Sequence, residues 1–148
     1  MAGRAGGRAG TGQAPGQLSN GTLFLDSQGL YLLVDGDPLM AARLKDALLR
    51  DLRVMTSVVT LVEAMNPKQR QPRWDFVLSR VHVLDVTRPI ADHAMRLLQA
   101  SGLLGHRYAI DAMVAASAMA QPGPTMLVTS DVDDLSHLCD PRILLIEA

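Results

Sequence analysis

Cysteine is nearly absent from this chain of 148 residues, which contains only Cys139. A single cysteine can form neither an intrachain disulfide nor a thiolate zinc site, and this usage is typical of a reducing compartment. Long apolar runs are also missing. None approaches the roughly 20 residues that span a bilayer, and the N-terminus lacks the apolar segment of a secretory signal. We therefore expect a soluble, cytoplasmic protein with no membrane partner.

Aromatic residues are scarce as well, at 3% of the chain. The core must therefore consist of aliphatic side chains, and the aromatic platforms with which many modules read RNA sequence are not available. The formal net charge of −1 argues against a protein that coats nucleic acids by displacing counterions. It does not exclude a nuclease, because clustered acids lower the net charge and bound cations restore it locally.

The first 20 residues are mostly Gly, Ala, Arg, Gln and Pro, with Leu18 as the one substantial apolar side chain. Such a segment cannot offset the entropy cost of becoming ordered. We therefore predict that residues 1–20 are a disordered Gly/Ala/Arg-rich tail and that residues 21–148 form one domain, because this length suits a single core.

Apolar runs and helical periodicity alternate along the rest of the chain. Asp37 followed by Pro38 is typical of a helix N-cap and first helical residue, and Gly102 is expected to end a helix. Strands are predicted at 22–26, 54–58, 82–86, 126–129 and 143–146, and helices at 38–52, 60–65, 73–80, 89–100, 108–119 and 132–138. This alternation predicts an α/β fold of three layers, with a mostly parallel central sheet covered by helices on both faces.

Two acids follow predicted strands closely. Asp26 ends the first strand, and Asp131 comes two residues after the fourth. In open parallel sheets, ligands bind beyond the carboxyl ends of the strands where the winding direction changes. An acid at the end of an apolar strand is costly to desolvate unless something there uses it. These two positions therefore indicate a functional site.

Two more acids interrupt apolar segments. Glu63 follows Val58 to Val62, and Asp111 precedes an alanine-rich stretch. Both are interpreted as acids on inward faces; the alternatives are that Glu63 faces solvent and that Asp111 is an N-cap. A site of four carboxylates suits Mg²⁺ or Mn²⁺. Zinc or copper is disfavoured, because no two of the four histidines form a metal-binding pair in the sequence. Such a site can hold a phosphate, activate water and support phosphodiester hydrolysis.

Four segments in this order resemble the PIN-domain family, and within it the VapC ribonuclease toxins of toxin-antitoxin pairs. The matching segments are 23–27 (LFLDS), 57–63 (SVVTLVE), 109–112 (AIDA) and 129–135 (TSDVDDL). The similarity extends from about residue 22 to residue 146. The N-terminal tail is outside the family pattern, and Gln28-Gly29 is unusual where small or apolar residues are common, which leaves the geometry of the first turn open.

The resemblance implies catalytic and metal-binding roles for Asp26, Glu63, Asp111 and Asp131. It also makes Asp134 a possible fifth metal ligand, with Asp133 able to share the role of Asp131. Ser27 and Thr129 are implied as site-lining hydroxyls.

The resemblance further implies a PIN-like nuclease domain over residues 21–148 that acts as a Mg²⁺- or Mn²⁺-dependent endoribonuclease. Its implied partners are an RNA substrate, a second copy in a homodimer and a cognate VapB-type antitoxin, whose arginine would enter the acidic site. RNA contact is expected from the basic segment 68–73, although a solvated surface is equally consistent with it. The alternative function is a catalytically weak PIN-like module that binds RNA or protein.

Overall fold

The computed structural model describes residues 20–148. The predicted tail over residues 1–20 lies outside the described residues except for Asn20, whose side-chain amide donates a hydrogen bond to the carbonyl of Arg50. The domain boundary that we predicted at residue 21 therefore stays a prediction. None of the helices within residues 20–148 is long and apolar enough to cross a membrane.

Five strands form one parallel sheet in the order β4-β3-β2-β5-β6. The strands are β2 (Thr22–Leu25), β3 (Arg53–Ser57), β4 (His82–Leu84), β5 (Thr125–Thr129) and β6 (Ile143–Glu147). The predicted three-layer α/β fold is confirmed. The chain builds the sheet outward from β2 to β4, then returns to the other side of β2 with β5, so the winding direction changes between β2 and β5.

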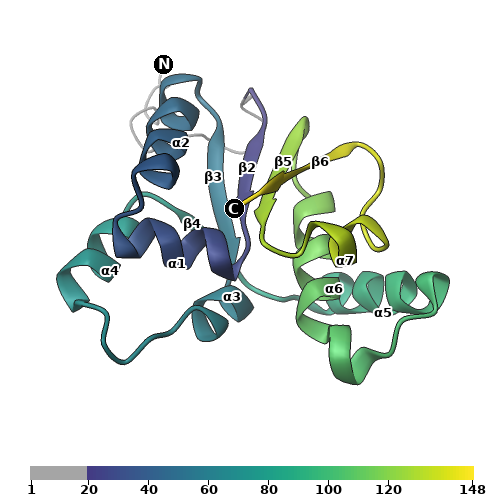
Figure 1. The fold of residues 1–148 in the computed structure, drawn as a ribbon. Coiled ribbons are helices and arrows are strands. Elements are labelled where there is room, and N and C mark those ends of the chain that lie inside the picture. Colours follow the sequence, from purple (N-terminus) through teal and green to yellow (C-terminus); the bar gives the residue numbers. More distant parts are fainter. Residues whose placement is uncertain (1–19) are drawn as a thin grey trace, which may run out of the picture.

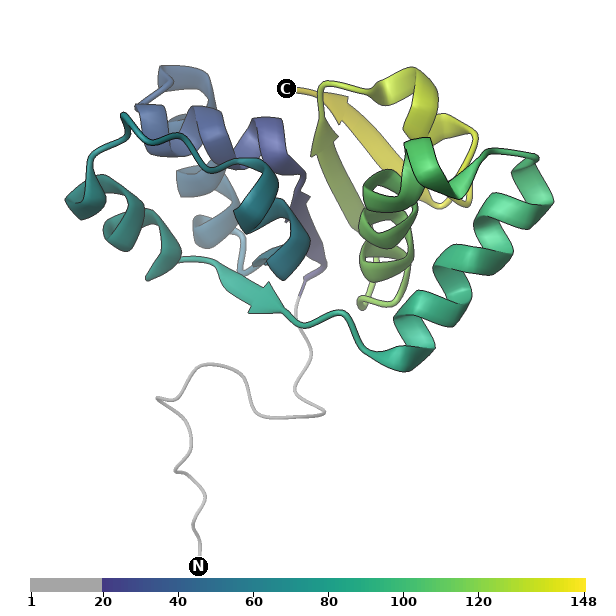
Figure 2. The ribbon, with the colours of Figure 1, turned by 90° about the horizontal axis from the view of Figure 1, so that it is seen from below.

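Helices cover both faces of this sheet (Figures 1 and 2). On one side lie α1 (Ser27–Asp35), α2 (Pro38–Leu49) and α4 (Gln71–Leu78), and on the other lie α5 (Arg88–Ser101), α6 (Gly105–Met119) and α7 (Val132–Ser136). The short α3 (Val58–Glu63) follows β3 directly and contacts both α1 and α6.

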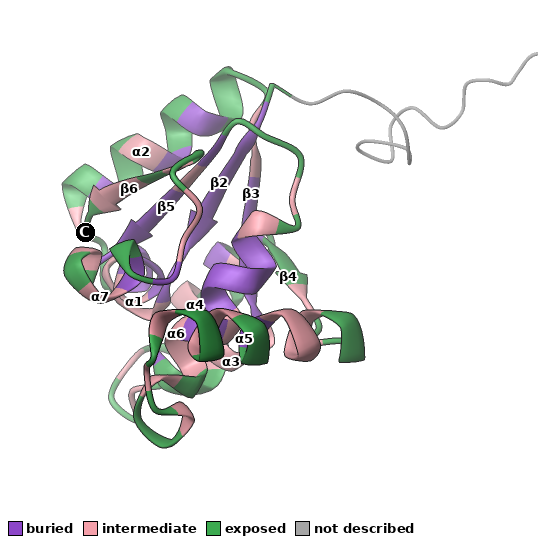
Figure 3. Ribbon diagram, turned by 90° about the vertical axis from the view of Figure 1, so that its right-hand side faces the viewer, coloured by how far each residue is buried: buried purple, intermediate pink, exposed green. Residues whose placement is uncertain are grey.

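Alternation along the central strand divides the core between the two faces. Leu23 and Leu25 pack into the cluster beneath α1 and α2, whereas Phe24 packs into the cluster beneath α6. Successive side chains of a strand point to opposite faces, so a strand covered on both sides is buried at every position, as β2 is. Figure 3 shows β2 buried along its length and β5 mostly buried, whereas the exposed segments lie on helices and loops at the outside.

The local signals that we used mark several element ends correctly. The Asp37 carboxylate accepts a hydrogen bond from the Met40 amide at 2.9 Å, and Pro38 opens α2. Gly102 ends α5 with φ of 71°, a left-handed conformation that glycine adopts without a Cβ penalty. The start of α2 and the end of α5 thus lie at their predicted capping residues.

Most predicted elements exist with ends that differ by a few residues, and the structure departs from the prediction most clearly in three places. Residues 27–35 were not predicted to be helical but form α1, and Asp26 is the N-cap of that helix as well as the residue after the strand. Val58 begins α3 instead of ending β3. The helix predicted from Tyr108 begins earlier, at Gly105, and is kinked at Tyr108 itself, whose φ and ψ are −113° and 16°.

Candidate metal centre

Asp26 lies at the carboxyl end of the central strand and is 3% exposed. One carboxylate oxygen accepts a hydrogen bond from the Ser27 amide at 2.7 Å, and the other accepts one from the Thr129 hydroxyl at 2.8 Å. Burial raises the pKa of Asp26 and is the largest influence; the two hydrogen bonds lower it, and the charges of Glu63 and Asp131 raise it further. A buried acid that is held by two donors has a fixed orientation.

Thr129 connects the two strands on either side of the change in winding direction. Its hydroxyl donates to Asp26 and accepts a hydrogen bond from the amide of Asp131 at 3.0 Å. Because Thr129 is fully buried at the end of β5, this one side chain fixes both the Asp26 carboxylate and the start of the loop that carries Asp131. The residue therefore sets the geometry of the site.

Asp111 approaches the same point from α6. It is half-buried, and burial is the main cause that raises its pKa to about 7, followed by the charges of Asp26, Asp131, Asp134 and Glu63. The alternative that Asp111 is an N-cap is wrong, because it lies within the helix. The next turns of α6 carry small buried residues, including Ala112, Ala115 and Ala116, which allow the helix to lie close to the sheet.

Three carboxylates meet at this point. One oxygen from each of Asp26, Asp111 and Asp131 lies within 4.8 Å of the other two. Asp26 is buried, Asp111 half-buried and Asp131 exposed, so the cluster extends from the interior of the fold to its surface. Each acid comes from a different part of the chain, and the change in winding direction brings their supporting elements together.

Glu63 lies near this cluster but is not one of its three closest members. It is exposed at the end of α3, so the interpretation as an inward-facing acid is wrong and the solvent-facing alternative is correct. Its charge nevertheless raises the pKa of both Asp26 and Asp111. Asp134 is half-buried on α7, and its charge raises the pKa of Asp111.

Ser27 lies at the N-terminus of α1 and lines a hollow of about 330 Å³. Gln28, Tyr31 and Glu63 line the same hollow. Gly29 explains the turn that the sequence left open: a Cβ there would lie 3.3 Å from a methyl group of Val128. The glycine lets α1 lie directly on β5 and brings its N-terminus beside the acids.

A group of buried hydroxyls that sequence reasoning missed supports the centre from β3 and α3. Thr56 donates a hydrogen bond to the carbonyl of Leu25 at 2.7 Å, and its hydroxyl oxygen contacts that of Thr60. Thr60 in turn donates to the carbonyl of Ser57. These contacts join the start of α3, and so Glu63, to the residue before Asp26. The signal was the close spacing of three hydroxyl residues in a buried, otherwise apolar segment.

The donor set fits a hard divalent cation. Mg²⁺ and Mn²⁺ prefer carboxylate oxygens, and the three closest donors are all carboxylates. Oxygens at about 2.1 Å from one octahedral Mg²⁺ are at most about 4.2 Å apart. The cluster, within 4.8 Å, therefore needs to contract only slightly to hold one ion.

A parallel sheet whose central strand ends in a buried aspartate, with two more aspartates converging on it, defines an α/β domain with a carboxylate centre. The family model of the PIN domain matches residues 23–140. This chain belongs to the PIN-domain family, which confirms the resemblance seen in its sequence.

Solved toxin-antitoxin structures have a similar fold. VapBC2 from Rickettsia felis, in a crystal structure with a DNA fragment from their promoter, matches with a TM-score of 0.65 and 20% identity over 86% of this chain and 98% of that one. A toxin-antitoxin complex from Klebsiella pneumoniae matches with a TM-score of 0.60 and 21% identity, over 83% of this chain and 95% of that one. FitAcB from Neisseria gonorrhoeae matches with a TM-score of 0.58 and 16% identity, over 84% of this chain and 96% of that one. No curated protein matches the sequence significantly.

Proposed function

We propose that this PIN domain is a Mg²⁺- or Mn²⁺-dependent endoribonuclease and the toxin of a VapBC-type pair. The observation that carries the proposal is the convergence of Asp26, Asp111 and Asp131, with one oxygen of each within 4.8 Å. Ribonuclease activity is typical of the PIN-domain family to which the chain belongs. The similar solved folds are those of toxin-antitoxin complexes.

In this proposal Asp26, Asp111 and Asp131 hold the cation, and Glu63 and Asp134, whose charges raise the pKa of Asp111, bind its water ligands. The bound cation would supply positive charge that binds a phosphate and lowers the pKa of a water molecule. Thr129 keeps the Asp26 carboxylate in one orientation through its 2.8 Å hydrogen bond.

Without a cation, the mutual repulsion of the acids adds to burial in raising the pKa of Asp111 to about 7. The Asp111 carboxyl is then partly protonated at neutral pH and releases that proton when a cation binds. We therefore propose that cation binding is favoured by higher pH over this range.

The activity test measures cleavage of a labelled RNA with Mg²⁺ or Mn²⁺ and with excess EDTA. We expect cleavage with either metal, none with EDTA, and at least a hundredfold loss in Asp26→Asn or Asp111→Asn, since removing a group that acts in the transition state typically costs about this factor. Asp85→Asn is a matched control because this exposed acid is outside the cluster. Unchanged activity in Asp26→Asn would overturn the proposal and leave the alternative of a binding module.

The proposed antitoxin partner has a suitable surface on this chain. An apolar groove of about 410 Å³ lies along α2 and α4 and includes Leu48, Leu49 and Phe76, all three of them exposed. Lys45 and Arg80 also line it, and Arg80 lies 4.3 Å from the Phe76 ring without an acidic partner among residues 20–148. An amphipathic antitoxin segment with apolar residues on one face and acids beside them would fit this groove.

We expect a short open reading frame beside the gene, and its product should copurify with the chain. Leu48→Glu should weaken this complex at least tenfold, because it places a charge in the apolar groove. An unchanged affinity would show that the antitoxin docks elsewhere. The homodimer that the family resemblance implies is a separate expectation, which light scattering of the purified chain tests.

A further inference from the structure

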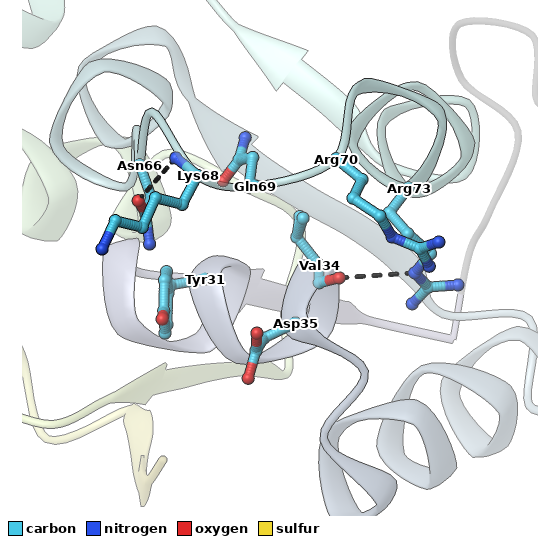
Figure 4. A pocket seen from close by; sticks show the side chains of 8 residues that line it. All are labelled: Tyr31, Val34, Asp35, Asn66, Lys68, Gln69, Arg70 and Arg73. Carbon is cyan, nitrogen blue, oxygen red and sulfur yellow. Dashed lines mark hydrogen bonds between the residues drawn. The ribbon is translucent and has the colours of Figure 1, made fainter.

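A second hollow, of about 200 Å³, lies between α1 and the segment 66–73 (Figure 4). Tyr31, Val34 and Asp35 line it from α1, and Gln69 lines it from the opposite segment. The remaining lining residues are Asn66, Lys68, Arg70 and Arg73. Three cations and one carboxylate thus surround the hollow, which makes its local charge positive although the chain as a whole is slightly acidic.

The three cations differ in what they contact. Arg73 donates hydrogen bonds to the carbonyls of Leu33 at 3.0 Å and Val34 at 3.3 Å, at the C-terminal end of α1. Its guanidinium therefore joins the two walls of the hollow. Among residues 20–148, the side chains of Lys68 and Arg70 have no hydrogen-bond or ion-pair partner. In the view of Figure 4 they lie at opposite ends of the hollow.

Gln69 adds an acceptor that has no donor. Its side-chain Oε1 is buried and has no hydrogen-bond partner in the described part of the chain. A buried polar atom without a partner costs free energy, so this oxygen is suited to a ligand that brings an N–H group. Asn66 holds the same loop in shape by accepting a hydrogen bond from the Lys68 amide at 3.0 Å.

The hollow continues toward the acidic centre. Tyr31 and Asn66 line both this hollow and the one that contains Ser27 and Glu63. Along α1, Ser27 and Asp35 are about 12 Å apart, because a helix rises about 1.5 Å per residue. A chain that leaves the acids along α1 therefore passes Tyr31 and arrives between Lys68 and Arg70.

We propose that this hollow is a nucleotide subsite for the RNA strand that passes the acidic centre. Lys68 and Arg70 bind backbone phosphates, Tyr31 stacks against a base, and Gln69 Oε1 accepts a hydrogen bond from an amino or imino group of that base. The inference rests on the proposed ribonuclease function. It also assigns separate roles within the basic segment, since Arg73 holds the wall while Lys68 and Arg70 contact the substrate.

The combination of groups favours RNA over an acidic protein segment. Unpaired cations attract either ligand, but an aromatic face beside an unpaired amide oxygen suits a base, which has a flat surface and N–H donors at its edge. A carboxylate side chain could not form a hydrogen bond with the Gln69 oxygen, because an ionised carboxylate only accepts hydrogen bonds.

The test measures binding of a short fluorescein-labelled single-stranded RNA of mixed sequence, by anisotropy in EDTA over a series of KCl concentrations. For Lys68→Gln combined with Arg70→Gln we expect about tenfold weaker binding. The slope of log affinity against log salt should become shallower by about 1.4, because each phosphate contact with a single strand contributes about 0.7. Tyr31→Leu should weaken binding about fivefold with little change in this slope, since stacking carries no charge.

Arg88→Gln combined with Arg96→Gln is the matched control, because it removes the same charge from α5 on the other face of the sheet (Figure 1). It should change RNA affinity less than twofold. Equal losses in both double variants would overturn the subsite and indicate a general effect of charge. A double variant at 68 and 70 that keeps RNA affinity but loses the antitoxin would assign the hollow to the protein partner.

Cleavage assays separate this inference from the proposed function. If the wild-type chain cleaves RNA and the double variant at 68 and 70 has an unchanged KM, the subsite is wrong and the nuclease stands. If the wild type never cleaves RNA but the double variant loses RNA binding and salt dependence as expected, the subsite stands and the proposed activity is wrong.

Discussion

Replacing Asp111 with Asn should stabilise the metal-free protein at alkaline pH while abolishing its stabilisation by metal. Asp111 faces the charges of Asp26 and Asp131 from a half-buried position, and its pKa rises from the ordinary value of 3.8 to about 7. Asparagine has nearly the same shape and no charge to desolvate. The substitution therefore removes the repulsion but also one of the three donors that would hold a cation.

The direction of the effect follows from proton binding. The unfolded chain releases the Asp111 proton near pH 3.8, and the folded metal-free chain releases it near pH 7. Between these values the folded state binds more protons, so this residue lowers the stability of the wild type as pH rises, and the full cost is present above pH 7. The complete shift corresponds to about 4 kcal/mol, which we reduce to about 1–2 kcal/mol because water screens a half-exposed group.

The assay is thermal unfolding in EDTA at about pH 5 and about pH 8, then with Mn²⁺ added. We expect Asp111→Asn to raise the Tm by about 4 °C at the higher pH and by less at the lower one, since about 1 kcal/mol shifts a domain of this size by about 2–4 °C. Mn²⁺ should raise the Tm of the wild type and not that of the variant. A variant that is less stable than the wild type at both pH values in EDTA would refute the electrostatic reasoning.

Three further predictions concern single side chains. Thr129→Val should weaken Mn²⁺ binding about tenfold in calorimetry, because it removes the hydrogen bond that orients Asp26. Thr125→Val on the same strand is the control, and an equal loss of Mn²⁺ affinity in both variants would contradict this role of Thr129. Asp37→Ala should lower the free energy of unfolding in urea by about 1 kcal/mol through loss of the N-cap, and an unchanged midpoint would show that the cap is dispensable. Burial raises the pKa of Cys139 to about 12, so iodoacetamide should alkylate it far more slowly in the folded chain than in urea at pH 8; equal rates would contradict the burial.

Much of the fold followed from local patterns. The strand at residues 22–25 and the helix from Pro38 were predictable because an apolar run and a capping pair act through near neighbours. The helix after Asp26 was missed because its residues also suit a loop after a strand, and Gly29 lowers its intrinsic helix propensity. The helix buries Gly29, Leu30, Leu33 and Val34. Gly29 lies against Val128, and such contacts join residues far apart in the chain.

The acidic residues were likewise predictable only in part. Asp26 and Asp131 were recognisable because they follow apolar strands. Together with Asp111 they have oxygens within 4.8 Å of one another, and the charges of Glu63 and Asp134 act on Asp111. The exposure of Glu63 was not predictable, because α3 ends at that residue and its last turn faces outward. A periodic pattern cannot show which way a short helix turns after it leaves a strand.

The sequence by itself determined the alternation of strands and helices, the hard oxygen character of the site and the resemblance to the PIN-domain family, because these properties reside in residue types and their order. Only the tertiary structure decided that Asp26, Asp111 and Asp131 have the closest carboxylate oxygens, and that Thr129 bonds both the Asp26 carboxylate and the Asp131 amide. It also decided that Arg73 supports a wall while Lys68 and Arg70 have no side-chain partner among residues 20–148. The physical reason is that distances between residues far apart in the chain depend on how helices pack on the sheet, and local sequence does not encode those distances.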